Sequence, residues 1–169
     1  MSVDKILSSF RPGEIIDDLQ IEELKRWRLL DFRPEPDDDH TSHAPIVVVC
    51  GCGRSGTTLA RVMLDTHPEL YAGPESLVFL PVPVDAGDLA RKFDLGEREV
   101  QALHEGTPSR ARFTERFKDL VLLTSGKRLW VDKTARNVHR LDHIWRHFSQ
   151  ARVIHVVREP RDVVASLKT

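Results

Sequence analysis

One stretch of the sequence decides the predicted fold, Ile46-Val47-Val48-Val49-Cys50-Gly51-Cys52-Gly53-Arg54-Ser55-Gly56-Thr57-Thr58-Leu59. Its first part is apolar and β-branched, which is typical of a buried strand. A glycine-rich turn follows, and a helical pattern opens after the turn. Glycines let the backbone approach a phosphate closely, and the N-terminus of a helix adds positive potential. The stretch therefore predicts an anion-binding loop.

The glycine spacing of this turn is that of a Walker A loop, but the lysine of that motif is missing. Four residues separate Gly51 from Gly56, as the motif requires. Thr57 stands where a nucleoside triphosphatase has the lysine that reaches the β- and γ-phosphates. The cation lies inside the loop instead, at Arg54. The sequence predicts a phosphate site without the charge that such an enzyme needs.

The composition is that of an ordinary soluble domain. The chain has 169 residues, of which 40% are hydrophobic and 30% charged, and its formal net charge is −1. This length is enough for one domain with a sizeable core. The balanced charge gives no basic field for nucleic acid or an anionic membrane, and no apolar stretch is long enough to cross a bilayer. We expect neither a nucleic-acid nor a membrane partner, and the oligomeric state stays open.

The cysteines and the N-terminal residues bear on the cellular compartment in which we expect the protein. The first ten residues are too polar for a secretory signal. Cys50 and Cys52 cannot build a disulfide framework, and two ligands do not make a zinc site. We expect both to be small residues of the loop in a cytoplasmic protein, with a redox role for the pair as the alternative.

Apolar patterns after the loop predict strands and helices in turn. We expect strands or turns at 46–50, 70–73, 127–131 and 152–157, and helices at 56–66, 86–93, 97–104, 109–124, 137–148 and from Pro160. This alternation predicts an α/β fold, with a P-loop-like parallel β-sheet flanked by helices and joined by right-handed crossovers. A sheet of three or four strands leaves its outer strands poorly covered, so we expect it to be incomplete at the C-terminus.

The chain divides into two regions. Residues 1–44 form an N-terminal segment with a helix over 17–30, in which acids come first and bases last. A polar linker over 33–44 ends this segment. Residues 45–169 form the α/β core.

Polar segments follow the predicted strands and are expected to meet. Ligands of open α/β sheets bind at the carboxyl ends of the strands. Four segments leave that edge, residues 51–58, 73–76, 132–134 and 158–162, and each carries polar side chains directly beyond an apolar run. We expect one site built from all four.

Two of these segments resemble motifs of the sulfotransferases that use 3′-phosphoadenosine 5′-phosphosulfate (PAPS). Gly53–Leu59 resembles their 5′-phosphosulfate loop, and its arginine is more like the tyrosylprotein and carbohydrate branches than the cytosolic small-molecule branch. Arg158–Ser166 resembles their 3′-phosphate motif. Glu75 and Lys133 stand between the two motifs, where the tyrosylprotein enzymes have a catalytic glutamate and a lysine that acts at the sulfuryl group. The resemblance covers most of the chain.

This resemblance implies that a sulfuryl group moves from PAPS to an acceptor hydroxyl, without a metal. Glu75 would act as the general base toward the hydroxyl. Arg54 and Lys133 would stabilise the transferring and leaving groups. The residues implied in donor binding are Arg54, Ser55, Gly56, Thr57 and Thr58 for the 5′ part and Arg158 and Ser166 for the 3′-phosphate.

The acceptor stays open among a hydroxyl-bearing small molecule, a carbohydrate and a peptide tyrosine. Residues 77–84 are apolar and would suit a hydrophobic part of an acceptor, but they can equally lie in the core. Arg110, Arg112, Arg116 and Lys118 would suit an acidic sugar or peptide, with a helix surface as the alternative.

Several candidate residues also have a plain structural interpretation. Glu75 can begin a helix, where the helix dipole favours an acid. Lys133 can pair with Asp132 on the surface, and Arg158 can pair with an acid one helical turn away.

Histidines at positions 139, 143 and 147 recur every four residues on one predicted helix. Such spacing can bind a metal. A partly exposed helix face is the expectation for these three side chains.

Two other functions stay open at this point. One is a P-loop nucleotide or small-molecule kinase, against which Thr57 in place of the Walker lysine speaks. The other is a non-catalytic nucleotide-binding fragment.

Overall fold

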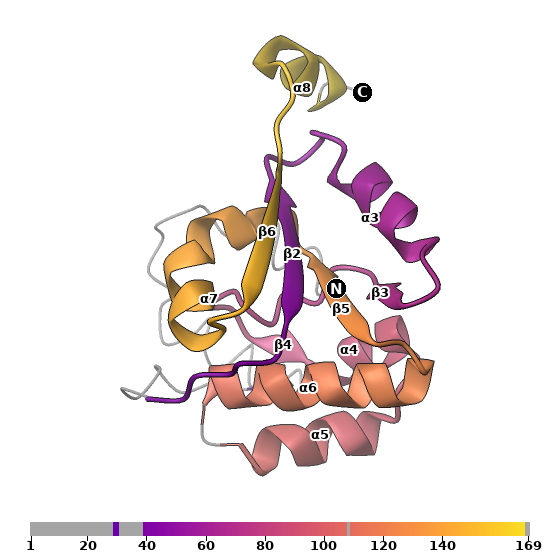
Figure 1. Ribbon diagram of the computed structural model, residues 1–169, viewed down its shortest axis with the longest axis vertical. Coiled ribbons are helices and arrows are strands. Elements are labelled where there is room, and N and C mark those ends of the chain that lie inside the picture. Colours follow the sequence, from indigo (N-terminus) through magenta and orange to yellow (C-terminus); the bar gives the residue numbers. More distant parts are fainter. Residues whose placement is uncertain (1–28, 31–38, 108, 168–169) are drawn as a thin grey trace.

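Residues 29–30, 39–107 and 109–167 are described by the computed structural model. At its centre lies a four-stranded sheet in the order β3-β5-β2-β6, in which neighbouring strands run parallel (Figure 1). The strands are β2 (Ile46–Gly51), β3 (Leu70–Ala72), β5 (Leu129–Lys133) and β6 (Ala151–Val156). The predicted α/β fold with a parallel sheet is confirmed.

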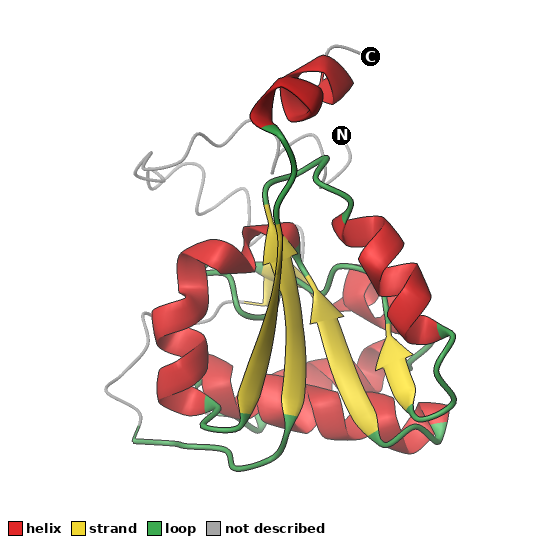
Figure 2. Ribbon diagram, turned by 45° about the horizontal axis from the view of Figure 1, so that its top comes forward, coloured by secondary structure: helices red, strands yellow, loops and turns green. Residues whose placement is uncertain are grey.

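Helices cover both faces of this sheet, with α3 on one face and α4, α6 and α7 on the other (Figure 1, Figure 2). The helices are α3 (Thr57–Asp65), α4 (Ala86–Phe93), α5 (Glu97–Glu105), α6 (Arg110–Ser125), the 3₁₀ helix η1 (Ala135–Arg140), α7 (Leu141–His147) and α8 (Pro160–Leu167). Helix α8 lies beyond the carboxyl ends of β2 and β6 (Figure 1). Within the described ranges, no helix combines the length and apolarity needed to cross a membrane.

Alternate residues of β2 enter two separate hydrophobic clusters, as the two-residue period of a strand requires. Ile46 and Val48 belong to the larger cluster, which includes Trp130 and Phe117 and joins the sheet to the helices of one face. Val49 belongs to the smaller cluster under α3. Full burial of such a side chain contributes about 1.5–3 kcal/mol, so these clusters hold the layers together.

The middle strand is displaced from its predicted position. A strand is predicted at 127–131, whereas β5 begins at Leu129 and ends at Lys133. Backbone pairing with β2 continues through Asp132 and Lys133, so both residues belong to the sheet and are buried. The prediction that they follow the strand is wrong.

The helix predicted over 17–30 lies outside the described residues except at its end. There, Leu29–Leu30 forms a short strand, β1, which pairs antiparallel with β4 (Val84–Asp85). The helical prediction is therefore wrong for these two residues, because backbone pairing with a distant segment overrides the local pattern.

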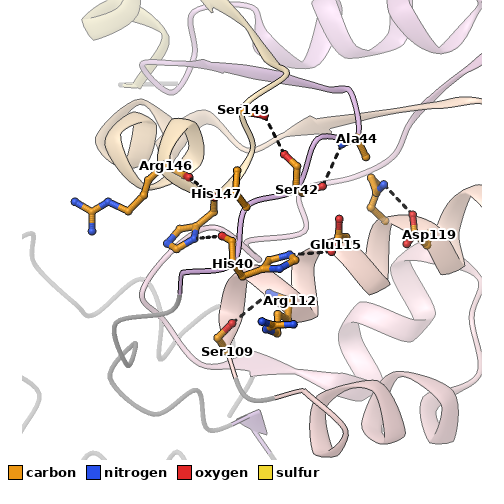
Figure 3. A network of polar contacts seen from close by, with 12 residues as sticks. His40, Ser42, Ala44, Ser109, Arg112, Glu115, Asp119, Arg146, His147 and Ser149 are labelled. Atoms are coloured by element: carbon orange, nitrogen blue, oxygen red, sulfur yellow. Dashed lines mark hydrogen bonds and ion pairs between the residues drawn. The ribbon is translucent and has the colours of Figure 1, made fainter.

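The end of the predicted polar linker lies against the core. The Ser42 backbone N–H donates to the carbonyl of His147 at 2.7 Å, and Ser42 forms a parallel bridge with Phe148. His40 Nε2 lies 2.8 Å from Glu115 Oε2 on α6 (Figure 3). Residues 39–44 thus connect α6 with α7.

Two of the basic side chains of α6 are buried. Arg110 donates from Nη1 to the carbonyl of Val78 at 3.0 Å and from Nη2 to that of Val82 at 3.1 Å. Lys118 is also buried, and so are residues 78–80. The central part of the apolar run, residues 78–80, therefore lies in the core, and neither Arg110 nor Lys118 offers a basic surface to an acidic acceptor.

The expectation of a partly exposed histidine face is wrong for two of the three histidines. His139 is exposed in η1, but His143 and His147 of α7 are buried, with ring centroids 4.6 Å apart. Burial, together with the positive charge of Arg140, lowers the pKa of His143 from 6.5 to about 3. His143 is consequently neutral in the folded protein.

We expect this neutral ring to make the fold sensitive to acid. Because the folded pKa is depressed, the stability it supports is complete above pH 6.5 and is lost as the pH falls toward 3. Urea unfolding should show that His143→Gln loses an acid sensitivity worth roughly 1 kcal/mol per pH unit between pH 6 and pH 4. His139→Gln is the control and should keep the parental slope. An unchanged slope in His143→Gln would contradict the prediction.

Gly51 lets β2 and β6 approach at their carboxyl ends. Its φ is +151°, and a Cβ at this position would lie 2.3 Å from the carbonyl oxygen of Val156. This oxygen belongs to the backbone of a paired strand and cannot turn aside. A side chain at position 51 would therefore force the two strands apart.

We expect Gly51→Ala to destabilise the fold by more than about 2 kcal/mol, because of this overlap. Gly53→Ala is the matched control, since a Cβ there has no neighbour within 4 Å. This variant should stay within about 0.5 kcal/mol of the parent. Chemical denaturation of the two variants measures the difference, and equal stabilities would refute the overlap.

Candidate functional site

The loop between β2 and α3 has the backbone of an anion-binding turn. Arg54 has a φ of +65° and Gly56 a φ of +100°, both in the left-handed region. The Ser55 N–H donates to the carbonyl of Cys52 at 3.2 Å, which closes the turn. Gly56 precedes α3 and supplies no side-chain cap. The first N–H groups of α3 thus face the loop without a capping side chain.

Most of the predicted site residues line one cavity of about 330 Å³ at this loop. Its lining residues are Gly53, Arg54, Gly56, Thr57, Thr58, Glu75, Ala135, Arg158 and Ser166. Among the predicted residues, only Ser55 and Lys133 are not in this lining. Ser55 is a buried residue of the loop itself, and Lys133 is buried beside Glu75. Segments distant in the sequence thus meet at the carboxyl edge of the sheet.

The loop contacts α8 and the segment before it through two arginines. Arg54 Nε donates to Ser166 Oγ at 3.0 Å, and Arg158 Nη1 donates to the carbonyl of Arg54 at 3.2 Å. Arg158 Nε also lies 3.8 Å from Asp162 Oδ2, the acid one helical turn away. Both guanidinium groups therefore lie at the junction of β2, α3 and α8.

Glu75 and Lys133 form an ion pair at the edge of the cavity. Lys133 Nζ lies 2.8 Å from Glu75 Oε1. The lysine side chain is 8% exposed and the glutamate side chain 41% exposed. Glu75 lies in an irregular segment after β3, so it does not begin a helix, and Lys133 does not pair with Asp132 on the surface.

The buried carboxylate of Asp132 lies next to this pair. Asp132 Oδ1 accepts a hydrogen bond from Ser76 Oγ at 2.5 Å, and Oδ2 accepts one from Asn137 Nδ2 at 2.6 Å. Burial, with a smaller contribution from the charge of Glu75, raises the pKa of Asp132 from 3.8 to about 6, although these two hydrogen bonds and one from Thr134 oppose the rise. Sequence analysis assigned no role to Ser76 or Asn137. In the sequence, only the position of Ser76 next to Glu75 and that of Asn137 just after β5 could have indicated that they contact Asp132.

The two cysteines are free and lie in different environments. Cys50 is a buried residue of β2, and burial raises the pKa of its thiol. Cys52 is exposed in the loop. Cys52 is thus a residue of the loop, as expected, whereas Cys50 belongs to the strand.

The arrangement suits a doubly anionic ligand beside a proton acceptor. A helix N-terminus and the guanidinium groups of Arg54 and Arg158 lie around one cavity. The Glu75 carboxylate also lines it, and the buried Lys133 ammonium pairs with that carboxylate from outside the lining. In the described part of the chain, no group of three or more potential metal-ligating side chains lies together. The fold and this site define an α/β protein with a candidate anion-binding site.

The chain belongs to the sulfotransferase family, because the profile described as "Sulfotransferase family" matches residues 45–169. Nodulation protein NoeE of Sinorhizobium fredii is 30% identical over 136 residues, which cover 75% of this chain and 32% of that protein. Protein-tyrosine sulfotransferase A of Caenorhabditis elegans is 48% identical over 42 residues, 25% of this chain and 11% of that protein. The chain thus spans about a third of NoeE and a smaller part of the tyrosine enzyme.

Solved structures agree with this assignment. The sulfotransferase domain of the Synechococcus PCC 7002 olefin synthase is 32% identical, with a TM-score of 0.50, over 80% of this chain and 55% of that domain. The sulfotransferase domain of the curacin biosynthetic pathway is 24% identical, with a TM-score of 0.53, over 73% of this chain and 50% of that domain. The latter likeness concerns the fold alone. The chain spans about half the length of these domains.

Proposed function

We propose that this chain forms the donor site and carries the catalytic pair of a PAPS-dependent sulfotransferase, which transfers a sulfuryl group to an acceptor hydroxyl. The observation that carries the proposal is the single cavity at which the glycine loop, Arg158 and Glu75 meet. Membership of the sulfotransferase family supports it. A kinase has no comparable support, because Thr57 occupies the position of the Walker lysine.

The donor fits the charges of this cavity. The uncapped N-terminus of α3 and the hydroxyl groups of Thr57 and Thr58 suit the 5′-phosphate. Gly56 adds a backbone N–H group of the same loop, and Ser55 supports the loop through its N–H, which donates to the Cys52 carbonyl. The forked guanidinium of Arg158 and the hydroxyl of Ser166 suit the 3′-phosphate.

In the proposed reaction the chain supplies a base and cations. Glu75 accepts the proton of the acceptor hydroxyl as that oxygen bonds to sulfur. Arg54 and Lys133 donate hydrogen bonds to the sulfuryl oxygens and to the bridging oxygen, where negative charge grows as the sulfur–oxygen bond of the donor breaks. The products are the sulfated acceptor and 3′-phosphoadenosine 5′-phosphate. No residue role in this scheme requires a metal.

The acceptor is a hydroxyl group of a small molecule, a carbohydrate or a peptide tyrosine. The name of the Caenorhabditis elegans relative indicates protein tyrosine as its own acceptor. Since only a quarter of this chain aligns with that relative, all three classes belong in an acceptor screen.

Calorimetry with 3′-phosphoadenosine 5′-phosphate tests the donor site. We expect saturable binding that exceeds that of ATP with Mg²⁺, and a loss of about 10- to 100-fold in Arg158→Ala, since a charge-assisted hydrogen bond is removed. Arg161→Ala, an exposed arginine of the same segment outside the cavity lining, should bind like the parent. Stronger binding of ATP with Mg²⁺ would favour the kinase instead.

Substitution of the proposed base separates binding from chemistry. Glu75→Gln should lower the rate of sulfuryl transfer by about 10²- to 10⁴-fold and leave the affinity for 3′-phosphoadenosine 5′-phosphate near the parental value. Glu69→Gln, an exposed acid paired with Arg128, is the control. A Glu75→Gln variant with full activity would remove Glu75 from the mechanism. Binding without any turnover of the parent would favour a non-catalytic nucleotide-binding fragment.

A further inference from the structure

We infer that Asp132 is a positioning residue, which holds the Glu75–Lys133 pair in register through the hydroxyl of Ser76. The inference rests on the proposed function, because it assigns the placement of the proposed base to a residue that does not line the cavity. Its basis is a short series of contacts between the segment after β3 and the end of β5.

The two segments are joined side chain to side chain at neighbouring positions. Glu75 pairs with Lys133 at 2.8 Å, and the next residue, Ser76, donates to Asp132 at 2.5 Å. One residue further, the Leu77 N–H donates to Thr134 Oγ1 at 3.5 Å. Three consecutive residues of the irregular segment thus contact three consecutive residues of the strand and its end.

The irregular segment needs this support. Leu77 has a φ of +61°, a left-handed conformation that is unfavourable for a residue with a branched side chain. Ser76 Oγ also accepts from the Val78 N–H at 3.3 Å, so one hydroxyl connects the turn to itself and to Asp132. Loss of this hydroxyl would release the backbone that carries Glu75.

Asp132 is itself held in place. Its side chain is buried, and its second oxygen accepts from Asn137 in η1 at 2.6 Å. A buried carboxylate with both oxygens hydrogen-bonded is rigid and costly to disturb. The carboxylate therefore provides a fixed point between β5, η1 and the Glu75 segment.

Ser76→Ala tests the inference most directly. This variant should lower kcat for sulfuryl transfer by about 10- to 100-fold, because misplacement of a reacting group by about 1 Å has that effect. The Kd of 3′-phosphoadenosine 5′-phosphate should stay within about twofold of the parent. Ser42→Ala is the matched control, since Ser42 and Ser76 are both 2% exposed and Ser42 lies outside the cavity lining.

An exchange of two side chains provides the rescue. Asp132→Asn turns the acceptor that faces Asn137 into a donor and should lower kcat. Adding Asn137→Asp reverses that hydrogen bond, while Asn at 132 still accepts from Ser76. The double variant should recover kcat to within about fivefold of the parent. Failure of the exchange to restore kcat, with the fold intact, would overturn the positioning role.

A second measurement tests the positioning role even if the protein shows no sulfuryl transfer. Acetylation of lysines followed by mass spectrometry should show at least a fivefold faster reaction of Lys133 in Ser76→Ala, with the half-exposed Lys127 as internal reference. If the parent neither binds the nucleotide nor transfers sulfate but Lys133 becomes reactive, the proposed function fails and the positioning role stands. If Ser76→Ala leaves both kcat and Lys133 reactivity unchanged, the positioning role is refuted.

Discussion

The close approach of β2 and β6 at Gly51 is the constraint on which the site depends. Because these strands are parallel, both end at the same edge, and the absence of a side chain at Gly51 allows their backbones to stay paired through Val156. The loop with Arg54 and the segment with Arg158 then leave the sheet side by side. The hydrogen bond from Arg158 to the Arg54 carbonyl follows directly from this geometry.

The charged side chains of the site differ in how deeply they are buried. Asp132 and Lys133 are adjacent and buried. Lys133 forms an ion pair with Glu75, and Asp132 accepts a hydrogen bond from Ser76, both on the segment after β3. Breaking a buried pair costs about 3–5 kcal/mol, because it leaves an uncompensated charge. Arg158, nearer the solvent, donates to the carbonyl of Arg54 and makes a longer contact of 3.8 Å with Asp162. Thus Lys133 is held in the interior, while the side chains of the proposed base and of the proposed 3′-phosphate contact both reach the solvent.

The local sequence pattern was sufficient to predict most helices and strands. It was not sufficient to predict which individual polar residues are buried. The strand of Ile46 and the turn after it were predicted because β-branched residues and glycines act within a few positions. By contrast, His143 and Arg110 were expected on a surface and are buried. Helical periodicity alone does not tell which face of a helix meets the sheet when polar residues lie on that face.

The sequence alone determined the strand, loop and helix that form the candidate anion site, since hydrophobic period, glycine spacing and the order of the motifs are local properties. It also determined the family, because those motifs occur in a definite order along the chain. Only the tertiary structure decided that Lys133 pairs with Glu75 and that Asp132 is anchored by Ser76 and Asn137. The physical reason is that these partners, apart from Asn137, lie more than fifty residues away, and the register of β5 brings them together.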